Sequence, residues 1–407
     1  MIKTCRLKFL LSEPLKYGAS EIGYGYDGTS DQLRYIRITD IASDGRLREN
    51  NQVYLSKDVG MQYALRPSDI LLARSGATVG KAFMFTGPAR SACFAGYLIR
   101  ARVNTKMAVP KFVYYSLMSD NYWAYVDSYH SKSTIQNLNA ELYGSVRVPY
   151  PSKEEQIKIV AFLDQAMGYA DTLIAKYERL LELLEEKNIA LVIQAVTKGL
   201  EARVSLKDSG IDWVGNIPNH WKVMPLKRLV SMKSGDQITS EQIQENGDFP
   251  VYGGNGLRGY TDSFTHNGAF TLIGRQGALC GNINYANGRF WASEHAVVVK
   301  PRSICSILWL GELLRSMNLG QYSVSAAQPG LSVEAIGNLK IPVPPYTEQA
   351  EISKLLEEHF RLIGDLCLKA TSAINLIQEH RSALITAAVT GQIDVANYKS
   401  SKIESVA

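Results

Sequence analysis

The sequence lacks most of the features that mark a specialised class of protein. Its five cysteines are scattered, odd in number and without metal-ligand spacing, at Cys5, Cys93, Cys280, Cys305 and Cys367. Such cysteines are typical of reduced cytosolic thiols, which predicts a cytoplasmic protein. No apolar run approaches the roughly 20 residues that span a bilayer. The apolar patch Phe9–Leu11 is followed at once by Glu13 and Pro14, so it is too short for a signal peptide.

Three short motifs resemble cofactor or substrate loops but miss a required part. Residues 23–28 satisfy GxGxxG, but no helical period follows, as a dinucleotide site requires. Residues 76–81 resemble a phosphate-binding loop that is one residue short, with Ala82 where Ser or Thr should bind Mg²⁺, and a strand turn is the better interpretation. In Val343-Pro-Pro-Tyr, which resembles a DNA methyltransferase motif, Val343 cannot accept a hydrogen bond from a flipped base.

The residues usually found in catalytic centres are also dispersed. The six histidines do not cluster, and the adjacent carboxylates Glu185 and Glu186 fall on a predicted helix as its solvated face. We therefore expect no catalytic residue, metal or cofactor in this chain.

The length of 407 residues is enough for two or three domains, and the net charge of +5 is unevenly distributed. Residues 1–152 carry 19 Lys and Arg against 12 Asp and Glu, and residues 201–345 carry 13 against 11. The stretches 153–200 and 346–407 each carry 6 against 8. A basic surface is typical of a nucleic-acid-binding protein, although an ordinary soluble surface accounts for this magnitude equally well.

One stretch of more than 50 residues occurs twice, without a gap and at an offset of 193. It begins VRVPYPSKEEQ at 146 and LKIPVPPYTEQ at 339, and the copies run on to AVTKG, ending at Gly199, and AVTG, ending at Gly391. A repeat of this length predicts two copies of one structural unit.

Each copy reads as a short strand followed by a long helix. The strands are expected at 146–150 and 339–343, and the prolines after them set the helix boundaries. Ser152, with Glu155 three residues later, and Thr347 are the expected N-caps. The terminal glycines are expected to stop the helices.

A mostly apolar seam follows each helix in alternating steps of three and four, for about five heptads, which predicts a coiled coil between the two copies. Asn188 and Arg381 interrupt the seam at equivalent positions, either to fix the register or because the seam is open to water there. The seam residues are Leu163, Met167, Ile174, Leu181, Leu184 and Asn188 in the first copy and Leu356, Phe360, Ile363, Ile374, Ile377 and Arg381 in the second. A helix of roughly 44 residues would be about 66 Å long.

The region before each helix is predicted to form a mixed α+β body, and the two bodies share sequence motifs. Strands are expected at 35–38, 82–85, 270–273 and 296–299. The stretch ILLARSGATVGKAFMF at 70–85 matches FTLIGRQGALCGNINY at 270–285 as strand, basic residue, glycine turn and strand. The bodies diverge far more than the helices, which indicates that the helices share a role while the bodies differ in theirs.

In this order the motifs resemble the specificity subunits of type I restriction–modification enzymes, over essentially the whole chain. The supporting segments are YIRITDIASDGRL at 35–47, DILLARSGATVGK at 69–81, SGIDWVGNIPNHWKVMPLKRL at 209–229, VYGGNGLRGY at 251–260, TLIGRQGALCGNI at 271–283 and the two VPYPSKEEQ and IPVPPYTEQ helix starts.

The resemblance implies an α+β fold with two target recognition domains, separated by two long antiparallel helices that form a coiled coil with internal pseudo-twofold symmetry. Its implied segments are recognition domains at 1–152 and 201–345, helices at 153–200 and 346–395, and a tail at 396–407. Each domain would read one half of a bipartite, asymmetric DNA target for phage defence. The helices would set the spacer length and dock two methylation subunits, which a restriction and translocation subunit joins. S-adenosylmethionine, ATP and Mg²⁺ would be bound by those partners.

Within this framework, arginine is the expected reader of guanine, and asparagine or glutamine of adenine. At every candidate the alternative is a surface charge or an internal ion pair, and Gly76, Gly254 and Gly277 are expected to set turns. The candidate DNA-binding residues are Arg37, Arg74, Ser75, Lys81, Lys132, Ser133, Thr134 and Gln136 in the first body and Asn255, Arg258, Tyr260, Arg275, Gln276 and Gln328 in the second.

Two other functions stay open at this stage. A self-contained DNA-modifying enzyme, such as a methyltransferase, would bind S-adenosylmethionine by itself. A coiled-coil scaffold without DNA contact would show no salt-dependent DNA binding even with its partners present.

Overall fold

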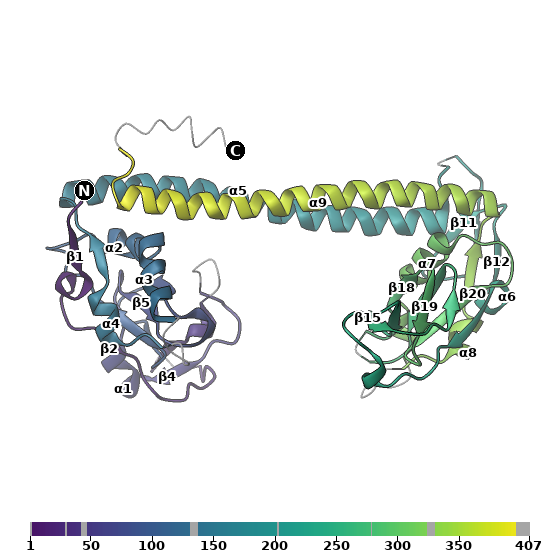
Figure 1. The fold of residues 1–407 in the computed structure, drawn as a ribbon. Coiled ribbons are helices and arrows are strands. Elements are labelled where there is room, and N and C mark those ends of the chain that lie inside the picture. The colour runs from purple at the N-terminus through teal and green to yellow at the C-terminus, as the bar shows by residue number, and fades with distance from the viewer. Residues whose placement is uncertain are drawn as a thin grey trace. The chain divides into compact units, whose positions relative to one another are not determined.

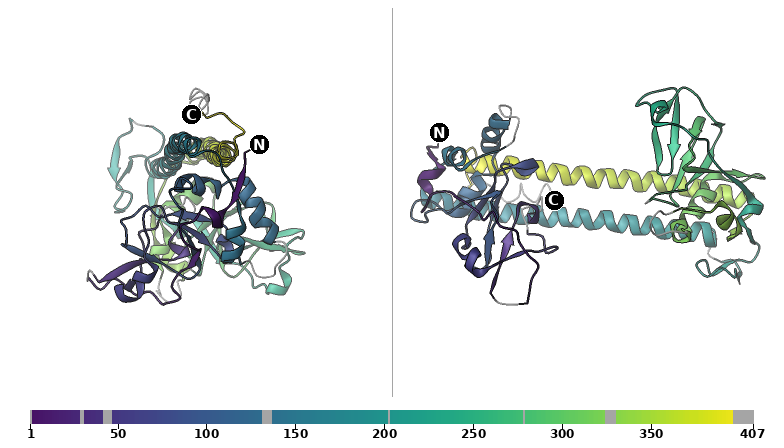
Figure 2. Two further views of the ribbon diagram at one scale, coloured as in Figure 1. Left: turned by 90° about the vertical axis from the view of Figure 1, so that its left-hand side faces the viewer. Right: turned by 90° about the horizontal axis from the view of Figure 1, so that it is seen from below.

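The computed structural model describes residues 2–28, 31–41, 47–130, 137–201, 203–277, 279–323 and 330–395. The chain divides into two compact units (Figures 1 and 2). One unit comprises residues 1–178 and 371–407, and the other comprises residues 179–370. Each unit therefore contains one body together with a part of each long helix.

The first body is built on two small sheets and one strand pair. The four-stranded antiparallel sheet has the order β2 (Lys16–Tyr17), β8 (Leu98–Ala101), β5 (Ile70–Ala73) and β6 (Ala82–Met84). In the second sheet, β3 (Gln32–Ile36) lies between antiparallel β4 (Tyr54–Ser56) and parallel β7 (Ala92–Phe94). The strand β1 (Thr4–Arg6) pairs with β9 (Arg147–Pro149).

Four short helices complete this body: α1 (Lys57–Gly60), α2 (Pro110–Ser116), α3 (Asp120–His130) and α4 (Ala140–Ser145). Pro110 begins α2, where its missing N–H costs nothing, and the Asn139 side chain caps α4 by accepting the Leu142 N–H. The apolar faces of α2 and α3 join residues of the long helices in one core cluster.

The second body repeats this plan. Its four-stranded antiparallel sheet has the order β13 (Val230–Ser234), β20 (Ala296–Pro301), β17 (Phe270–Gly274) and β18 (Ile283–Ala286). The other sheet has the order β15 (Gly256–Thr261), β14 (Phe249–Gly253), β19 (Arg289–Ala292) and β16 (His266–Asn267), with β14 and β19 parallel. The strand β12 (Lys222–Pro225) pairs with β21 (Lys340–Val343).

Further elements of this body are the hairpin β10 (Leu206–Asp208) and β11 (Asn216–Pro218) and the helices α6 (Leu226–Leu229), α7 (Ile307–Ser316) and α8 (Val333–Asn338). The predicted echo between the bodies is confirmed, because matching strands pair in the same order. One predicted strand is too long: β3 ends at Ile36, and the chain turns into a single 3₁₀ turn at Ile38–Asp40, which an Arg37–Asp40 contact closes.

The two long helices are α5 (Lys153–Lys198) and α9 (Tyr346–Val389). The capping box at Ser152 is confirmed, since its N–H and hydroxyl donate to Glu155 and its Oγ accepts the Glu155 N–H. Thr347 is not an N-cap, because α9 already begins at Tyr346. The distal helix also ends before residue 395, at Val389. Gly199 and Gly391 have φ values of +73° and +71°, so both stop signals are confirmed.

The predicted seam is buried or half-buried at all twelve positions. In the first unit, Leu163 and Met167 of α5 share a core with Leu384 and Ala388 of α9. In the second unit, the pairing joins the opposite ends of the same helices, as the core of Val192, Val196, Ile352 and Leu356 shows. The two helices are therefore antiparallel within each unit. No helix in the described ranges is long and apolar enough to cross a membrane.

The two polar interruptions of the seam differ from each other. Arg381 is half-buried: its side chain is 21% exposed, and its Nη1 lies 2.6 Å from Oδ1 of Asp171 on the other helix. This contact joins the two helices in the first unit. Asn188, in the second unit, has a buried Oδ1 without a hydrogen-bond partner among the described residues.

Candidate nucleic-acid interface

A glycine turn after a buried strand is built in the same way in both bodies. In the first body it joins β5 to β6: Gly80 N–H donates to Ala73 O, Val79 N–H to Gly76 O, and Ala73 N–H to Lys81 O. The predicted strand turn at 76–81 is therefore confirmed. Gly76 has a φ of +77°, a conformation that favours glycine.

The second body repeats these hydrogen bonds one for one between β17 and β18. Gly281 N–H donates to Gly274 O, Cys280 N–H to Gly277 O, and Gly274 N–H to Asn282 O. Gly277 has a φ of +92°, so it occupies the same position as Gly76. The two stretches matched in the sequence thus share one backbone conformation at an offset of 201 residues.

Arg74 and Arg275 open the two turns and are held by equivalent partners. Their N–H groups donate to Tyr97 O and His295 O, respectively. Their carbonyls accept the N–H groups of Leu138 and Leu331, which are separated by the repeat offset of 193. Each turn is therefore braced both by the start of a neighbouring strand and by the segment leading into the repeated helix.

The two guanidinium groups also lie against the first strand of their own sheet. The Arg74 guanidinium lies 4.9 Å from the centre of the Tyr17 ring, a cation–π contact. The Arg275 Nη1 donates to Ser234 Oγ at 3.1 Å. Tyr17 and Ser234 are the last residues of β2 and β13, the matching strands of the two sheets. Both arginines are half-buried, so they are positioned by the protein before any ligand binds.

Around the first turn, the side chains left towards solvent are those of Ser75, Lys81 and Tyr97. Ser75 is half-buried and forms a backbone bridge with Asn137. Lys81 is exposed at the start of the return strand. Tyr97 is 64% exposed, which is unusual for a large aromatic side chain and typical of a binding surface.

Around the second turn, the corresponding side chains form a polar cluster. Gln276 Oε1 lies 3.1 Å from His295 Nδ1, and Nδ1 is the donor in the tautomer that carries its proton there. Glu294 Oε1 lies 3.3 Å from His295 Nε2, a contact that is an ion pair only when the imidazole is protonated. Asn282 Nδ2 donates to Asn255 Oδ1 at 2.8 Å, which links this turn to the one between β14 and β15.

The structure thus brings together Asn255, Arg275 and Gln276 among the predicted readers of the second body. The turn that carries Asn255 lies directly against the second turn, since a Cβ at Gly254 would lie 3.3 Å from Gln276 O. Arg258 is exposed, farther along β15, with its side chain folded over Gly253. Tyr260 is half-buried, and its backbone bridges to Gln244.

Arg37 lies apart from the first turn, at the end of β3, and is engaged within the protein. Its Nε and Nη2 contact Asp40 at 3.2 and 2.8 Å, and Nη2 also donates to Asn51 O. The hydrogen bonds to Asp40 raise the pKa of the Arg37 guanidinium. The Arg37 side chain is therefore engaged in an internal ion pair, the alternative to DNA binding that the sequence leaves open. Five further candidates lie outside the described residues: Lys132, Ser133, Thr134, Gln136 and Gln328.

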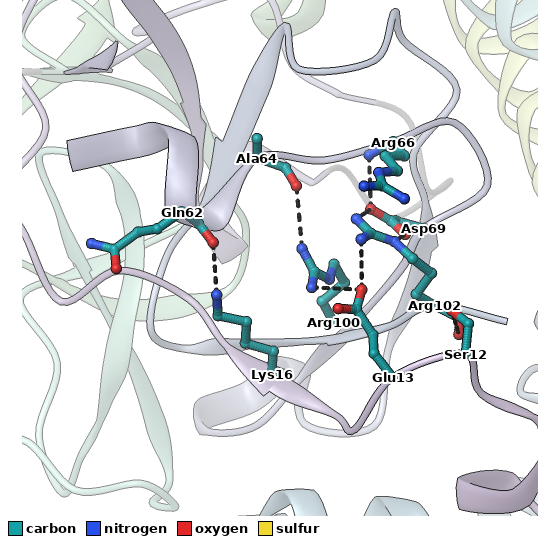
Figure 3. A network of polar contacts seen from close by, with 9 residues as sticks. All are labelled: Ser12, Glu13, Lys16, Gln62, Ala64, Arg66, Asp69, Arg100 and Arg102. Carbon is teal, nitrogen blue, oxygen red and sulfur yellow. Dashed lines mark hydrogen bonds and ion pairs between the residues drawn. The ribbon is translucent and has the colours of Figure 1, made fainter. Parts of the chain in front are cut away.

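A buried ionic network secures the opposite ends of β5 and β8 (Figure 3). Asp69, 1% exposed just before β5, accepts two hydrogen bonds of 2.7 Å from Arg102. Glu13 accepts from Arg100 at 2.9 Å and pairs with Arg102. Burial lowers the pKa of the Arg100 guanidinium, and hydrogen bonds to Asp69 raise that of Arg102. Since β5 leads into Arg74 and β8 starts after Tyr97, this network anchors the strands that present the turn.

The second body has no such network at the matching positions. By strand register, Val298 stands where the first body has Arg100, and it is 5% exposed in an apolar cluster with Leu272 and Phe290. The same strand frame is therefore held by charge in one body and by apolar packing in the other.

Sequence reasoning missed several residues of these sites. Tyr97 and His295 are brought to the turns by strand pairing between distant segments, and no local pattern distinguishes them. Asn282 lies within the stretch 270–285 that the sequence already matches to the first body. Gln156 and Gln349 were visible as part of the repeated E-Q pair. Their side chains accept the N–H groups of Val109 and Ser306 at 2.8 and 3.1 Å, which ties each long helix to its body.

Comparison with known proteins identifies the family. The type I restriction modification DNA specificity domain matches residues 26–183 and 218–367. The chain belongs to this family. The two matches each cover most of one body and run into the long helix that follows it, in agreement with the internal repeat. The resemblance seen in the sequence is confirmed.

Individual relatives in the family are similar over most of their length. The type I restriction enzyme EcoprrI specificity subunit of Escherichia coli is 27% identical over 347 residues, which cover 82% of each chain. The type I restriction enzyme MjaVIII specificity subunit of Methanocaldococcus jannaschii is 21% identical over 382 residues, covering 86% of this chain and 85% of the relative.

Solved structures confirm the fold of this family member. One, described as the structural basis of complex assembly and conformational transition of the type I R-M system, has a TM-score of 0.73 at 16% identity and covers 96% of this chain and 98% of its own. The HsdS subunit of Thermoanaerobacter tengcongensis has a TM-score of 0.54 at 16% identity, covering 96% and 97%. Within the described part of this chain, no group of three or more His, Cys, Asp or Glu residues could hold a metal ion.

Proposed function

We propose that this chain is the DNA sequence-recognition subunit of a type I restriction–modification complex, in which each body reads one half of a bipartite, asymmetric target. The observation that supports this best is the pair of glycine turns, with one backbone hydrogen-bond pattern and different exposed side chains. A constant frame with variable side chains is suited to reading two different half-sites. Phosphate contacts would position the bodies, and base-edge contacts would specify the sequence.

The two long helices would act as the frame that fixes the spacing between half-sites and docks the partner subunits. Their repeated sequence supports two equivalent docking surfaces, and hence two methylation subunits that a restriction and translocation subunit joins. The chain itself would be non-catalytic and cytoplasmic. S-adenosylmethionine, ATP and Mg²⁺ would then be bound by the partners.

The decisive experiment is to express the chain with its partner subunits in a host and to sequence the modified adenines. We expect one bipartite motif. Replacing residues 1–152 by the first body of another family member should change one half of the motif and leave the other half and the spacer unchanged. A change in both halves would show that the bodies do not read independently.

A second experiment addresses the helices. Inserting one heptad into α5 and a matching heptad into α9 keeps the apolar seam in register. The spacer in the motif should lengthen while both half-sites stay the same. An unchanged spacer in a stable variant would remove the helices from the determination of spacing.

Two binding measurements separate this function from its alternatives. With its partners, the chain should bind DNA with an affinity that falls steeply with salt, because phosphate neutralisation releases counterions. Clear binding of S-adenosylmethionine by the purified chain alone would instead indicate a self-contained methyltransferase.

A further inference from the structure

In the second body, the glycine turn after β17 and the residue before β20 bring two side chains into contact. The first body has two different side chains at the equivalent positions. Gln276 and His295 touch through the 3.1 Å contact between Oε1 and Nδ1. Their counterparts are Ser75 and Tyr97, because both turns have the same hydrogen bond from the turn arginine to the carbonyl at the start of the next strand. The positions are therefore neighbours in both bodies.

Residues that are identical in the two turns cannot make the bodies read different sequences. This removes the turn arginines, Arg74 and Arg275, and the four glycines of the two turns, Gly76, Gly80, Gly277 and Gly281. The described positions that differ and carry a polar group towards solvent are Ser75 with Gln276, Tyr97 with His295, and Lys81 with Asn282. Lys81 is a point charge, a chemistry that suits phosphate better than a base edge.

We infer that Ser75 with Tyr97, and Gln276 with His295, are the specificity-determining pairs of the two bodies. This inference rests on the proposed function and adds to it the residues that distinguish one half-site from the other. His295 also has a positioning role, since its ring contacts the side chain of Gln276.

The contact in the second body decides what Gln276 can read. Reading adenine takes both ends of a glutamine amide, with Oε1 accepting from N6 and Nε2 donating to N7. In the tautomer with the proton on Nδ1, His295 donates to Oε1 of Gln276. Gln276 then presents its Nε2 donors, which fit acceptors such as guanine O6 and N7 or thymine O4. The histidine thus restricts the glutamine to donating.

The first body offers different groups at the same place. Ser75 has a short hydroxyl that both donates and accepts, and Tyr97 adds a second hydroxyl and an aromatic ring that is 64% exposed. The nearby exposed amide is that of Asn137, whose Oδ1 lies 3.4 Å from Arg74 Nε, so it differs in position from the Gln276 amide. The two bodies therefore present different hydrogen-bonding patterns from one backbone frame.

The test exchanges the pairs within the complete complex of the chain with its partner subunits. In Ser75→Gln with Tyr97→His, the first half-site should change at one or two base pairs, with a roughly 10- to 100-fold change in preference between bases, the range of one good side-chain–base contact. The second half-site is the internal control and should not change. The matched control Lys81→Asn exchanges the third position and should weaken binding to all sequences without altering the motif.

A second variant tests the role of His295 alone. His295→Ala removes a half-buried ring outside the described core clusters, so folding should persist, and it frees Oε1 of Gln276. Preference at one base pair of the second half-site should move towards adenine by roughly 10-fold or more. Folded variants with unchanged motifs in both experiments would overturn the inference and leave the proposed function intact. A parent complex that modifies no bipartite target would overturn the proposed function itself.

Discussion

The side-chain carbonyl of Gln156 accepts the backbone N–H of Val109 at 2.8 Å, in the residue that precedes helix α2. Its amide donates to Pro151 O at 3.0 Å, and the residue is only 1% exposed. Gln349 repeats both contacts in the second unit, with Ser306 and Pro344. Gln156 and Gln349 are therefore equivalent: each hydrogen-bonds to a proline before its long helix and attaches that helix to its body.

Gln156→Leu should destabilise the first unit by about 1–3 kcal/mol, because the buried Val109 N–H and Pro151 carbonyl lose their partner. Hydrogen exchange at the Val109 amide should accelerate in step with this loss. Gln165→Leu, at an exposed position of the same helix, is the control and should leave that amide protected. Equal protection in both variants would show that Gln156 is dispensable for the attachment.

The two polar seam residues should respond in opposite ways to the same substitution. Asn188→Leu should stabilise the second unit by about 1–2 kcal/mol, since the buried Oδ1 has no partner among the described residues and leucine fills the seam. Arg381→Leu should destabilise the first unit by about 1 kcal/mol, because Asp171 loses its 2.6 Å partner. Denaturant midpoints of the two variants measure the difference. The same sign in both would contradict the asymmetry of the seam.

The ionic network of the first body should be sensitive to loss of a single charge. Asp69→Asn should cost roughly 3–5 kcal/mol, because it leaves Arg102 partly uncompensated in a buried site. Glu21→Gln, at an exposed carboxylate in the same body, should cost less than about 0.5 kcal/mol. Urea unfolding with circular dichroism detection compares the two. A small loss for Asp69→Asn would mean that apolar packing, as at Val298, already suffices to hold these strands.

The stability of the second unit should fall as the pH is lowered through the titration of His266. Burial lowers the pKa of this imidazole, which stacks on Phe290 at 5.4 Å and lies 2.7 Å from Thr265 Oγ1. A depressed folded-state pKa means that the unfolded chain binds the proton more readily. The stabilisation is therefore complete above the unfolded pKa of about 6.5 and is lost as the pH falls through the folded value.

His266→Gln should reduce this acid sensitivity below about pH 6.5. Tryptophan fluorescence is a suitable probe because four of the five tryptophans lie in the second unit: Trp213, Trp221, Trp291 and Trp309. His380→Gln, at an exposed position of α9, is the control and should keep the parent's pH dependence. Identical pH profiles for parent and His266→Gln would assign the acid sensitivity to other groups.

The helices could be predicted closely because their signals are local. The repeat, the prolines before Ser152 and the apolar seam gave the starts and the buried faces, and the φ values at Gly199 and Gly391 agree with the predicted stops. Thr347 was assigned as a cap by its residue type, but α9 begins one residue earlier, at Tyr346, directly after the Pro344–Pro345 pair. Residue preference alone does not fix a boundary to one position.

The candidate site could be predicted only in part because strand pairing is non-local. Arg74 and Arg275 stand next to recognisable glycine turns, so the sequence revealed them. Tyr97 and His295 reach the same turns through the register of β8 and β20, which no pattern along the chain displays. Arg37 has the residue type expected of a base reader, but its side chain pairs with Asp40. This ion pair depends on a turn that the sequence does not predict.

The constant offset of 193 extends beyond the helices into each body, to the bridge residues Asn137 and Gly330, whereas the glycine turns are offset by 201. The length differences between the two bodies therefore lie upstream of these bridges. A genetic exchange that joins a new upstream segment at this point would keep the length of the chain from the bridge to the long helix unchanged. Body residues that contact the long helices from upstream of the bridge, such as Val109 and Ser306, would have to be supplied by the incoming module.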